Sequence, residues 1–361
     1  MNSVDHNLEQ TPKGMHHRTE LPKPSPLGPL VRLQGKWVGT GFNQISRPRN
    51  KTSNTKFSKP LNLEDLINDN LMELKLTSEQ LTFLELLGEA DIFLNGIPYT
   101  QTVKDVTNTD TGRGNLAETP GTIHFETGMM MFIPGSKIPT PPDQLLRMAN
   151  IPHGTFISAR GPASPTITKS KAPDIPKSTA RLPQDLDNFI AAGTIDQAVL
   201  SDSNKLLRKQ NKKTKFIETT SFFFDSSVPI RRNDILDGDE NTDIMNIPFL
   251  RGNSRNVNNP NANTVRVGSK FCISTVEHTV TAPAWKPTQA DHSLRIPAHT
   301  GANVPLLEVT SSMGIAAPKQ ITVWSMQIQY SQSVLLQFAS LNWPHVNVAT
   351  LVPASPTQVA L

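Results

Sequence analysis

The chain contains a single cysteine, Cys272, and therefore cannot form an intramolecular disulfide. A disulfide-stapled scaffold is excluded, and a reducing compartment is the simpler assumption. Cys272 lies in the short apolar run FCIS. An apolar neighbourhood of this kind is more typical of a small buried side chain than of a nucleophile.

Long hydrophobic runs are also missing from the sequence. No window approaches the ~18–20 apolar residues that a membrane-spanning helix needs. Residues 1–20 are polar and lack the apolar stretch of a secretory signal. The sequence therefore predicts a cytoplasmic protein without membrane insertion.

Charge of one sign is not in large excess, since 35 Lys+Arg stand against 31 Asp+Glu and the formal net charge is +4. Nucleic-acid-binding proteins usually concentrate basic charge on one face or element. The one dense basic run, residues 205–215, has no aromatic partner, and we interpret it as a solvated loop rather than a phosphate-binding patch. We expect no nucleic-acid partner.

Several catalytic motifs are absent from the sequence. It has no G-x-x-x-x-G-K-S/T phosphate loop, no H-E-x-x-H, no C-x-x-C and no G-x-S-x-G. Their absence argues against a P-loop nucleotide enzyme, a zinc protease and an α/β-hydrolase.

Proline and glycine, in contrast, are plentiful, with 30 and 20 residues, and hydrophobic residues make up only 36%. Both residue types suit turns and loops better than helix interiors, so we expect a real core joined by long polar connections. Residues 1–27 are predicted to be a flexible arm. Residues 28–361 are predicted to form one domain, with an elaborated, partly loop-like insertion at about 161–270 and a helix at 186–200.

Alternation of apolar and polar residues predicts β-strands. The clearest case is 322–338, where even positions are mostly apolar and odd positions mostly polar, so that we expect one long antiparallel strand or a hairpin of two. Segment 71–87 is interpreted as strand, with helix as the rival. Asn95-Gly96 is predicted to be the turn of a hairpin over 91–106. Further strands are predicted at 123–133, 151–160, 216–224, 270–280 and 344–352.

This pattern gives eight to ten strands and no alternation of strand and helix, which argues against a parallel sheet. A sandwich and a closed barrel are the two alternatives. A closed barrel has no edge strands to protect and can enclose a ligand. We therefore predict an all-β fold, an antiparallel closed barrel with long loops and one or two short helices.

Three histidines stand in apolar, strand-like context: His124, His153 and His345. A lone histidine on a sheet is more often a hydrogen-bonded structural residue. His345 is distinctive because it follows Trp343 and Pro344 and enters an apolar run. Desolvation favours the neutral imidazole, which is the form that ligates haem iron.

His124 and Glu126 are two residues apart, so both side chains face the same side of one strand. The pair fits acid–base chemistry, and it fits a buried structural hydrogen bond equally well. Methionine suits irregular apolar space, so the nearby methionines are interpreted as cavity lining or core. These residues are Met129, Met130, Met131 and Met148.

Five segments resemble, in order, the strands of a known family. Residues 33–41, around Trp37, are similar to a G-x-W-x-G-x-G first strand, and residues 344–351 to a terminal H-L-x-A-x-L strand. The intervening matches are 96–102, 123–128 and 151–154. Together they resemble the nitrobindin family of haem-binding, calycin-like β-barrels. This chain departs from the family at Asn43, which replaces a glycine, and in residues 161–320, which have no family counterpart.

The resemblance implies ferric haem b, held through iron by His345 and lined by Trp343, Trp37, His124 and His153. It implies binding of nitric oxide or a related small oxidant and, if the protein is an enzyme, a haem-dependent peroxynitrite isomerase or peroxidase-like activity. Two other hypotheses stay open. One is a carrier for a lipid-like apolar molecule, and the other is an enzyme without haem that uses His124 and Glu126. A homodimer is compatible with all three.

Overall fold

The computed structural model describes eleven stretches of the chain, and within them the fold is all-β, as predicted. Helical structure there comprises the 3-10 helix η1 (Gly28–Leu33), the short helix α3 (Lys205–Asn211) and the single helical residue Val199. The described residues are 27–46, 72–83, 95–106, 121–133, 143–151, 155–178, 199, 202–226, 263–288, 292–338 and 341–361.

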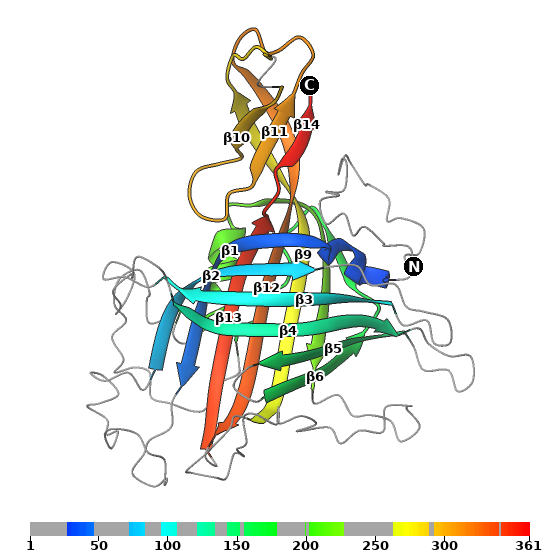
Figure 1. Ribbon diagram of the computed structural model, residues 1–361, viewed down its shortest axis with the longest axis vertical. Coiled ribbons are helices and arrows are strands. Elements are labelled where there is room, and N and C mark those ends of the chain that lie inside the picture. The colour runs from blue at the N-terminus through cyan, green and yellow to red at the C-terminus, as the bar shows by residue number, and fades with distance from the viewer. Residues whose placement is uncertain are drawn as a thin grey trace, which may run out of the picture.

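One large antiparallel sheet of eleven strands dominates the molecule and curls into a half-barrel (Figure 1). It has more strands than the eight to ten that the sequence predicts. In spatial order the strands are β6 (Thr155–Pro162), β5 (Gln144–Ile151), β4 (Thr122–Ile133), β3 (Asn95–Asp105), β2 (Met72–Phe83), β1 (Gly35–Ser46), β13 (Leu341–Pro353), β12 (Lys319–Phe338), β9 (Asn263–Ala282), β8 (Lys215–Asp225) and β7 (Thr166–Lys169).

The first strand of this curled sheet, β6, also pairs with β8, the last strand but one. Arg160 of β6 pairs with Asp225 of β8. A Cβ atom on the next residue, Gly161, would lie 1.7 Å from the carbonyl oxygen of Phe223. Only glycine permits the two backbones to come so close.

The concave side of the half-barrel holds the main core. Leu30 and Leu33 of η1 insert into it, and the indole Nε1 of Trp37 donates a 2.8 Å hydrogen bond to the Leu33 carbonyl. Leu27, which the sequence assigned to the flexible arm, is fully buried there as well. Other members are Ile97, Met130, Leu145, Phe271, Ile328 and Leu351.

Most of the predicted strands are confirmed. The described part of segment 71–87, residues 72–83, forms strand β2 and not a helix, and 322–338 lies in one continuous strand, β12, rather than a hairpin. The other confirmed strands are β4, β8, β9 and β13. Side-chain alternation identified β12, because its even positions, such as Ile328 and Tyr330, lie in the core.

Three local predictions are wrong. Asn95-Gly96 is no turn, because both residues lie within β3 and pair with Phe132 and Met131; Gly96 serves a close approach to the backbone of β4 instead. Segment 151–160 is not one strand but the junction of β5 and β6. The basic run 205–215 contains helix α3 and the first residue of β8, because Leu207 and Asn211 face inward while the lysines face outward.

The interval 161–270 contributes ordered elements to the large sheet. It supplies β7, α3, β8 and the start of β9. Residues 179–198, 200–201 and 227–262 lie outside the described residues, and with them nearly all of the predicted helix at 186–200. Across the described residues, no helix is long and apolar enough to cross a membrane.

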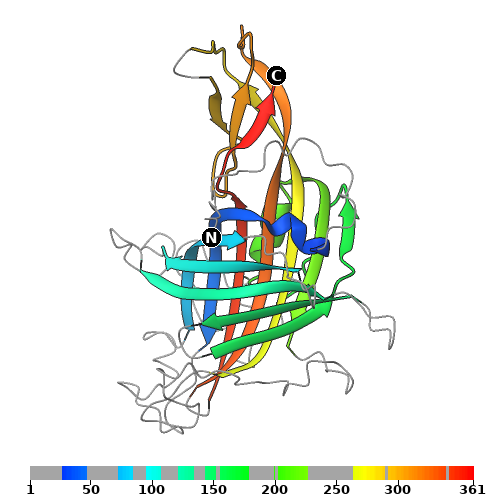
Figure 2. The same ribbon diagram turned by 45° about the vertical axis from the view of Figure 1, so that its right-hand side comes forward.

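A second, three-stranded sheet projects from one end of the half-barrel, where β9 and β12 extend beyond it (Figures 1 and 2). Its strands are β10 (Leu294–Pro297), β11 (Leu306–Thr310) and β14 (Thr357–Ala360). It has its own hydrophobic cluster, which includes Val280, Ile296, Leu307, Val309 and Ile321. Asn303 anchors it to the barrel by accepting a 2.8 Å hydrogen bond from the Thr40 amide.

Two histidines stack near the base of this small sheet. The rings of His278 and His299 lie 5.6 Å apart, and His278 Nε2 is 2.8 Å from Ser325 Oγ. Burial lowers the pKa of His278 from 6.5 to about 4, and His299 adds to this while Glu277 opposes it. His278 is therefore neutral in the folded protein at neutral pH.

The low pKa of His278 predicts acid sensitivity. Between pH 6.5 and pH 4 the unfolded chain gains a proton at His278 that the folded chain does not. Stability must therefore fall as the pH falls through this range. We expect His278→Gln to flatten the thermal-midpoint profile between these pH values, whereas the exposed His292→Gln leaves it unchanged. An unaltered slope in His278→Gln contradicts the assignment.

Candidate functional site

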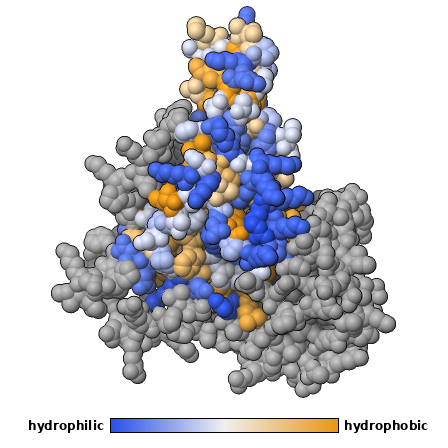
Figure 3. Space-filling view, turned by 180° about the vertical axis from the view of Figure 1, so that it is seen from behind, coloured by the Kyte–Doolittle hydropathy of each residue, from blue (hydrophilic) through white to orange (hydrophobic). Residues whose placement is uncertain are grey.

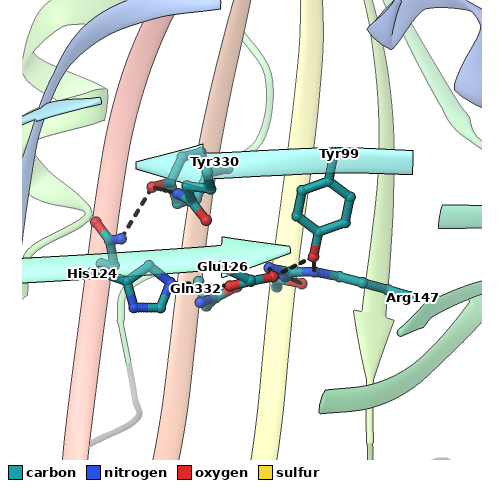
Figure 4. A network of polar contacts seen from close by, with 9 residues as sticks. Tyr99, His124, Glu126, Arg147, Tyr330 and Gln332 are labelled. Carbon is teal, nitrogen blue, oxygen red and sulfur yellow. Dashed lines mark hydrogen bonds and ion pairs between the residues drawn. The ribbon is translucent and has the colours of Figure 1, made fainter. Parts of the chain in front are cut away.

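Arg147 of β5 is the centre of a buried polar network on the concave face (Figure 4). Its Nε donates to Tyr99 Oη at 2.8 Å, and its Nη2 to Glu126 Oε1 at 2.7 Å. Its Nη1 donates to Gln332 Oε1 at 2.5 Å and to Ser269 Oγ at 3.2 Å. Each of these five side chains comes from a different strand: β3, β4, β5, β9 and β12. The network therefore connects two parts of the sheet, β3–β5 on one side and β9 and β12 on the other.

A glycine positions the tyrosine of this network. A Cβ atom at Gly128 would lie 2.8 Å from the Tyr99 ring, so the ring lies directly over that residue. This places the Tyr99 hydroxyl within reach of Glu126, to which it donates a hydrogen bond. Strand alternation then turns Glu126 and His124 to the same side of β4.

The network holds two opposite charges in the core. Burial alone would raise the pKa of Glu126, but the Arg147 guanidinium, His124 and the Tyr99 hydroxyl together lower it from 4.5 to about 2. Burial opposes the charge of Arg147 as well, yet Glu126 raises its pKa above the ordinary value. Burial also raises the pKa of Tyr99. The carboxylate and the guanidinium are thus ionised, and the phenol is neutral.

His124 lies at the edge of the network. Its Nε2 is 3.1 Å from Glu126 Oε2, and its side chain is 21% exposed against 0% for Glu126. The prediction that the two side chains face the same side is confirmed, and they form the hydrogen bond. A carboxylate with a pKa of about 2 is a weak base at neutral pH, so this geometry favours the structural alternative.

A second polar group lies beside this network on the same face. Tyr330 Oη accepts hydrogen bonds from Gln101 Nε2 at 2.9 Å and from Asn347 Nδ2 at 3.0 Å. Asn347 Oδ1 is buried and has no hydrogen-bond partner among the described residues. It is an acceptor that a bound molecule can satisfy.

His345 lies two residues before Asn347 on β13 and is half-buried. The register pairs it with Val334 of β12, two residues from Gln332. Because alternate residues of a strand share a face, His345 belongs to the concave side together with Asn347.

The remaining predicted haem-lining residues divide into two groups. Trp37 lies on the concave side, but it packs against η1 in the core. Trp343 lies in β13, where its backbone pairs with Leu336, and its side chain is outside the described part of the structure. His153 also lies outside the described residues. Strand order thus brings His124, His345 and Trp37 to one side of the sheet.

The described residues contain no group of three or more His, Cys, Asp and Glu side chains suited to hold a metal ion. The described residues place two imidazoles, those of His124 and His345, on the concave side. Axial ligation by one histidine is sufficient for haem.

Sequence reasoning missed Arg147, Tyr99, Gln332 and Ser269. A signal was present at Arg147, which stands alone in the apolar run LLRMA. A charge in such a run must find a partner if the run is buried. The identity of that partner depends on strand order, which no short motif encodes.

Comparisons with protein-family models, with curated proteins and with solved structures find no match for this chain. The resemblance to the nitrobindin family therefore rests on the five segments alone.

Proposed function

We propose that the large sheet is a calycin-like ligand-binding barrel whose concave face binds a small, mainly apolar molecule. The contact between β6 and β8 supports closure, because Arg160 pairs with Asp225 where Gly161 packs on the Phe223 carbonyl. In a closed barrel, no strand edge would be left unpaired where β6 meets β8.

The observation that carries the proposal is the Arg147 network inside an otherwise apolar core. Small-molecule sites are mostly apolar and contain a few placed polar groups. Here His124, whose side chain is 21% exposed, and Asn347 Oδ1, which has no partner among the described residues, are polar groups that a ligand can contact, since Arg147 and Glu126 bind each other.

Haem b is the ligand that we propose first. His345 is the axial donor, because it is the half-buried imidazole on β13 of the concave face. His124 lies on β4 as the polar side chain nearest the network. When bound, ferric haem would supply an iron atom that binds nitric oxide or a related small oxidant.

The test is a titration of purified protein with hemin, followed at the Soret band. We expect His345→Ala to weaken hemin binding by at least about tenfold. Removing an outer-shell partner of a metal ligand lowers metal affinity by about 10–100-fold, and removing the ligand itself costs more. The matched control is His292→Ala, an exposed histidine beside the small sheet, which should bind as the wild type does. Equal affinities for His345→Ala and wild type would exclude the ligand assignment.

A carrier of a lipid-like molecule is the second candidate. Val334 and Leu336 of β12 have buried apolar side chains, and Val334 pairs with His345. Apolar side chains at this position favour a lipid carrier. Native mass spectrometry of freshly purified protein separates the two candidates. A co-purified lipid without haem favours the carrier, and a mass increment of haem favours the first proposal.

A further inference from the structure

Part of the convex face of the half-barrel, which points away from the Arg147 network, is buried and carries polar side chains beside apolar ones such as Phe42 and Val348. The odd-numbered residues of β12 are mostly polar, and such a face ordinarily lies in water. Here seven neutral polar residues of β8, β9, β12 and β13 are at most 6% exposed: Thr219, Ser221, Ser274, Ser325, Gln327, Gln329 and Thr350. These residues form a buried layer on the convex side of the sheet, separate from the hydrophobic core on the concave side.

Helix α3 and residues 170–178 cover this layer. Asn204, Leu207 and Asn211 follow helical spacing and are buried on one side of α3. Asn204 Nδ2 donates to the Pro176 carbonyl at 2.8 Å, and Ser203 Oγ donates to Gln44 Oε1 of β1 at 2.9 Å. Seen from behind, the described surface below the small sheet is largely hydrophilic (Figure 3).

Hydrogen bonds connect the helix to the sheet beneath it. Gln329 Nε2 donates to Thr350 Oγ1 at 3.2 Å, and Thr350 Oγ1 donates to Gln210 Oε1 at 2.7 Å. Asn211 follows Gln210 on α3, and Gln327 lies two residues from Gln329 on the same face of β12. Gln210, Thr350 and Gln329 therefore form a hydrogen-bonded seam between α3 and the sheet, and Asn211 and Gln327 are buried next to it on the same two elements.

Five buried amide atoms on α3, at its N-cap and on β12 have no hydrogen-bond partner among the described residues. They are Gln327 Nε2, Gln329 Oε1, Asn204 Oδ1 and both Oδ1 and Nδ2 of Asn211. A buried polar group without a partner costs free energy, and five would cost a large part of the stability of an ordinary domain. An empty seam is inconsistent with a stable fold, so the atoms must have partners.

We propose that the seam between α3 and the convex face is a second internal site that binds hydroxyl groups, either ordered water or a small neutral polyol in its place. The unpartnered atoms include both donors and acceptors, and a hydroxyl group satisfies both. The buried polar side chains of this layer are amides and hydroxyls and carry no charge, which disfavours an ionic guest. This site is independent of the concave face and of the ligand proposed there.

Two substitutions test whether the seam is occupied. In an occupied seam, Gln329→Met and Asn211→Leu each remove hydrogen bonds to the guest, and we expect the thermal midpoint to fall by roughly 3 °C or more. In a dry seam Asn211→Leu removes only unpartnered side-chain atoms, so its midpoint would stay or rise, whereas Gln329→Met would lose no more than its bond to Thr350. Lys209→Leu, an exposed change on the same helix, is the control and should leave the midpoint unchanged.

A second measurement detects the guest itself. Water oxygen-17 magnetic relaxation dispersion reports long-lived internal water, and its amplitude should be smaller in Gln329→Met than in the wild type. If ribitol at millimolar concentration raises the midpoint of the wild type but not of Asn211→Leu, the guest is a polyol. If ribitol has no effect and the dispersion amplitude falls, the guest is water. A midpoint that does not fall in either variant, with an unchanged dispersion amplitude and no ribitol effect, overturns the proposal.

Discussion

Replacing Arg147 with methionine is expected to lower the free energy of unfolding by about 3–5 kcal/mol. The substitution leaves the Glu126 carboxylate, which is 0% exposed, without the guanidinium that offsets its burial. It also removes the donors to Tyr99 and Gln332. Urea denaturation followed by circular dichroism measures the loss.

Two further variants separate the ion pair from simple loss of packing. The double variant Arg147→Met with Glu126→Gln should recover part of the stability, because it leaves no unpaired charge in the core. Arg295→Met breaks an ion pair with Glu308 whose arginine is 63% exposed, and it should cost less than about 1 kcal/mol. Equal losses for Arg147→Met and Arg295→Met would show that the buried network contributes nothing special.

Gly161→Ala is expected to destabilise the protein by about 3 kcal/mol, at the upper end of ordinary overpacking. The added Cβ would lie 1.7 Å from the backbone oxygen of Phe223, so β6 must move away from β8. Thermal unfolding measures the cost, and amide hydrogen exchange should show faster opening of both strands.

Gly121→Ala is the matched control for that substitution, since no heavy atom lies within 4 Å of a Cβ built there. It should leave stability and exchange nearly unchanged. If Gly161→Ala proves as stable as Gly121→Ala, the contact between β6 and β8 is not tight, and the support for a closed barrel is lost.

The positions of individual strands were predictable from the sequence, but the elements that pack beside each strand were not. The alternation in 322–338 identified β12, and its even positions, such as Ile328 and Tyr330, do lie in the core. Some of the mostly polar odd positions, such as Gln327 and Gln329, are buried as well, and Gln329 is linked through Thr350 to Gln210 of α3. Helix α3 was not predicted, because the lysines of residues 205–215 indicated a solvated loop. Leu207 and Asn211 do have helical spacing in that segment.

The candidate site was predictable only in part. The spacing of His124 and Glu126 was enough to place both on one side of a strand, and the apolar run after His345 was enough to place it on a terminal strand. The partners of Glu126 were not predictable, because Arg147, Tyr99 and Gln332 come from separate strands that only the sheet order brings together. The small sheet escaped prediction as well, since its strands have only four or five residues.

The central claim is that the concave face binds the ligand, and a hydrogen–deuterium exchange footprint of hemin tests it most directly. Exchange of backbone amides slows where a ligand stabilises the structure against local opening. With hemin bound, we predict slower exchange in β13 around His345 and in β4 around His124, with no change in β10, β11 and β14. Protection confined to the small sheet, or hemin binding without protection of β13, would contradict the account.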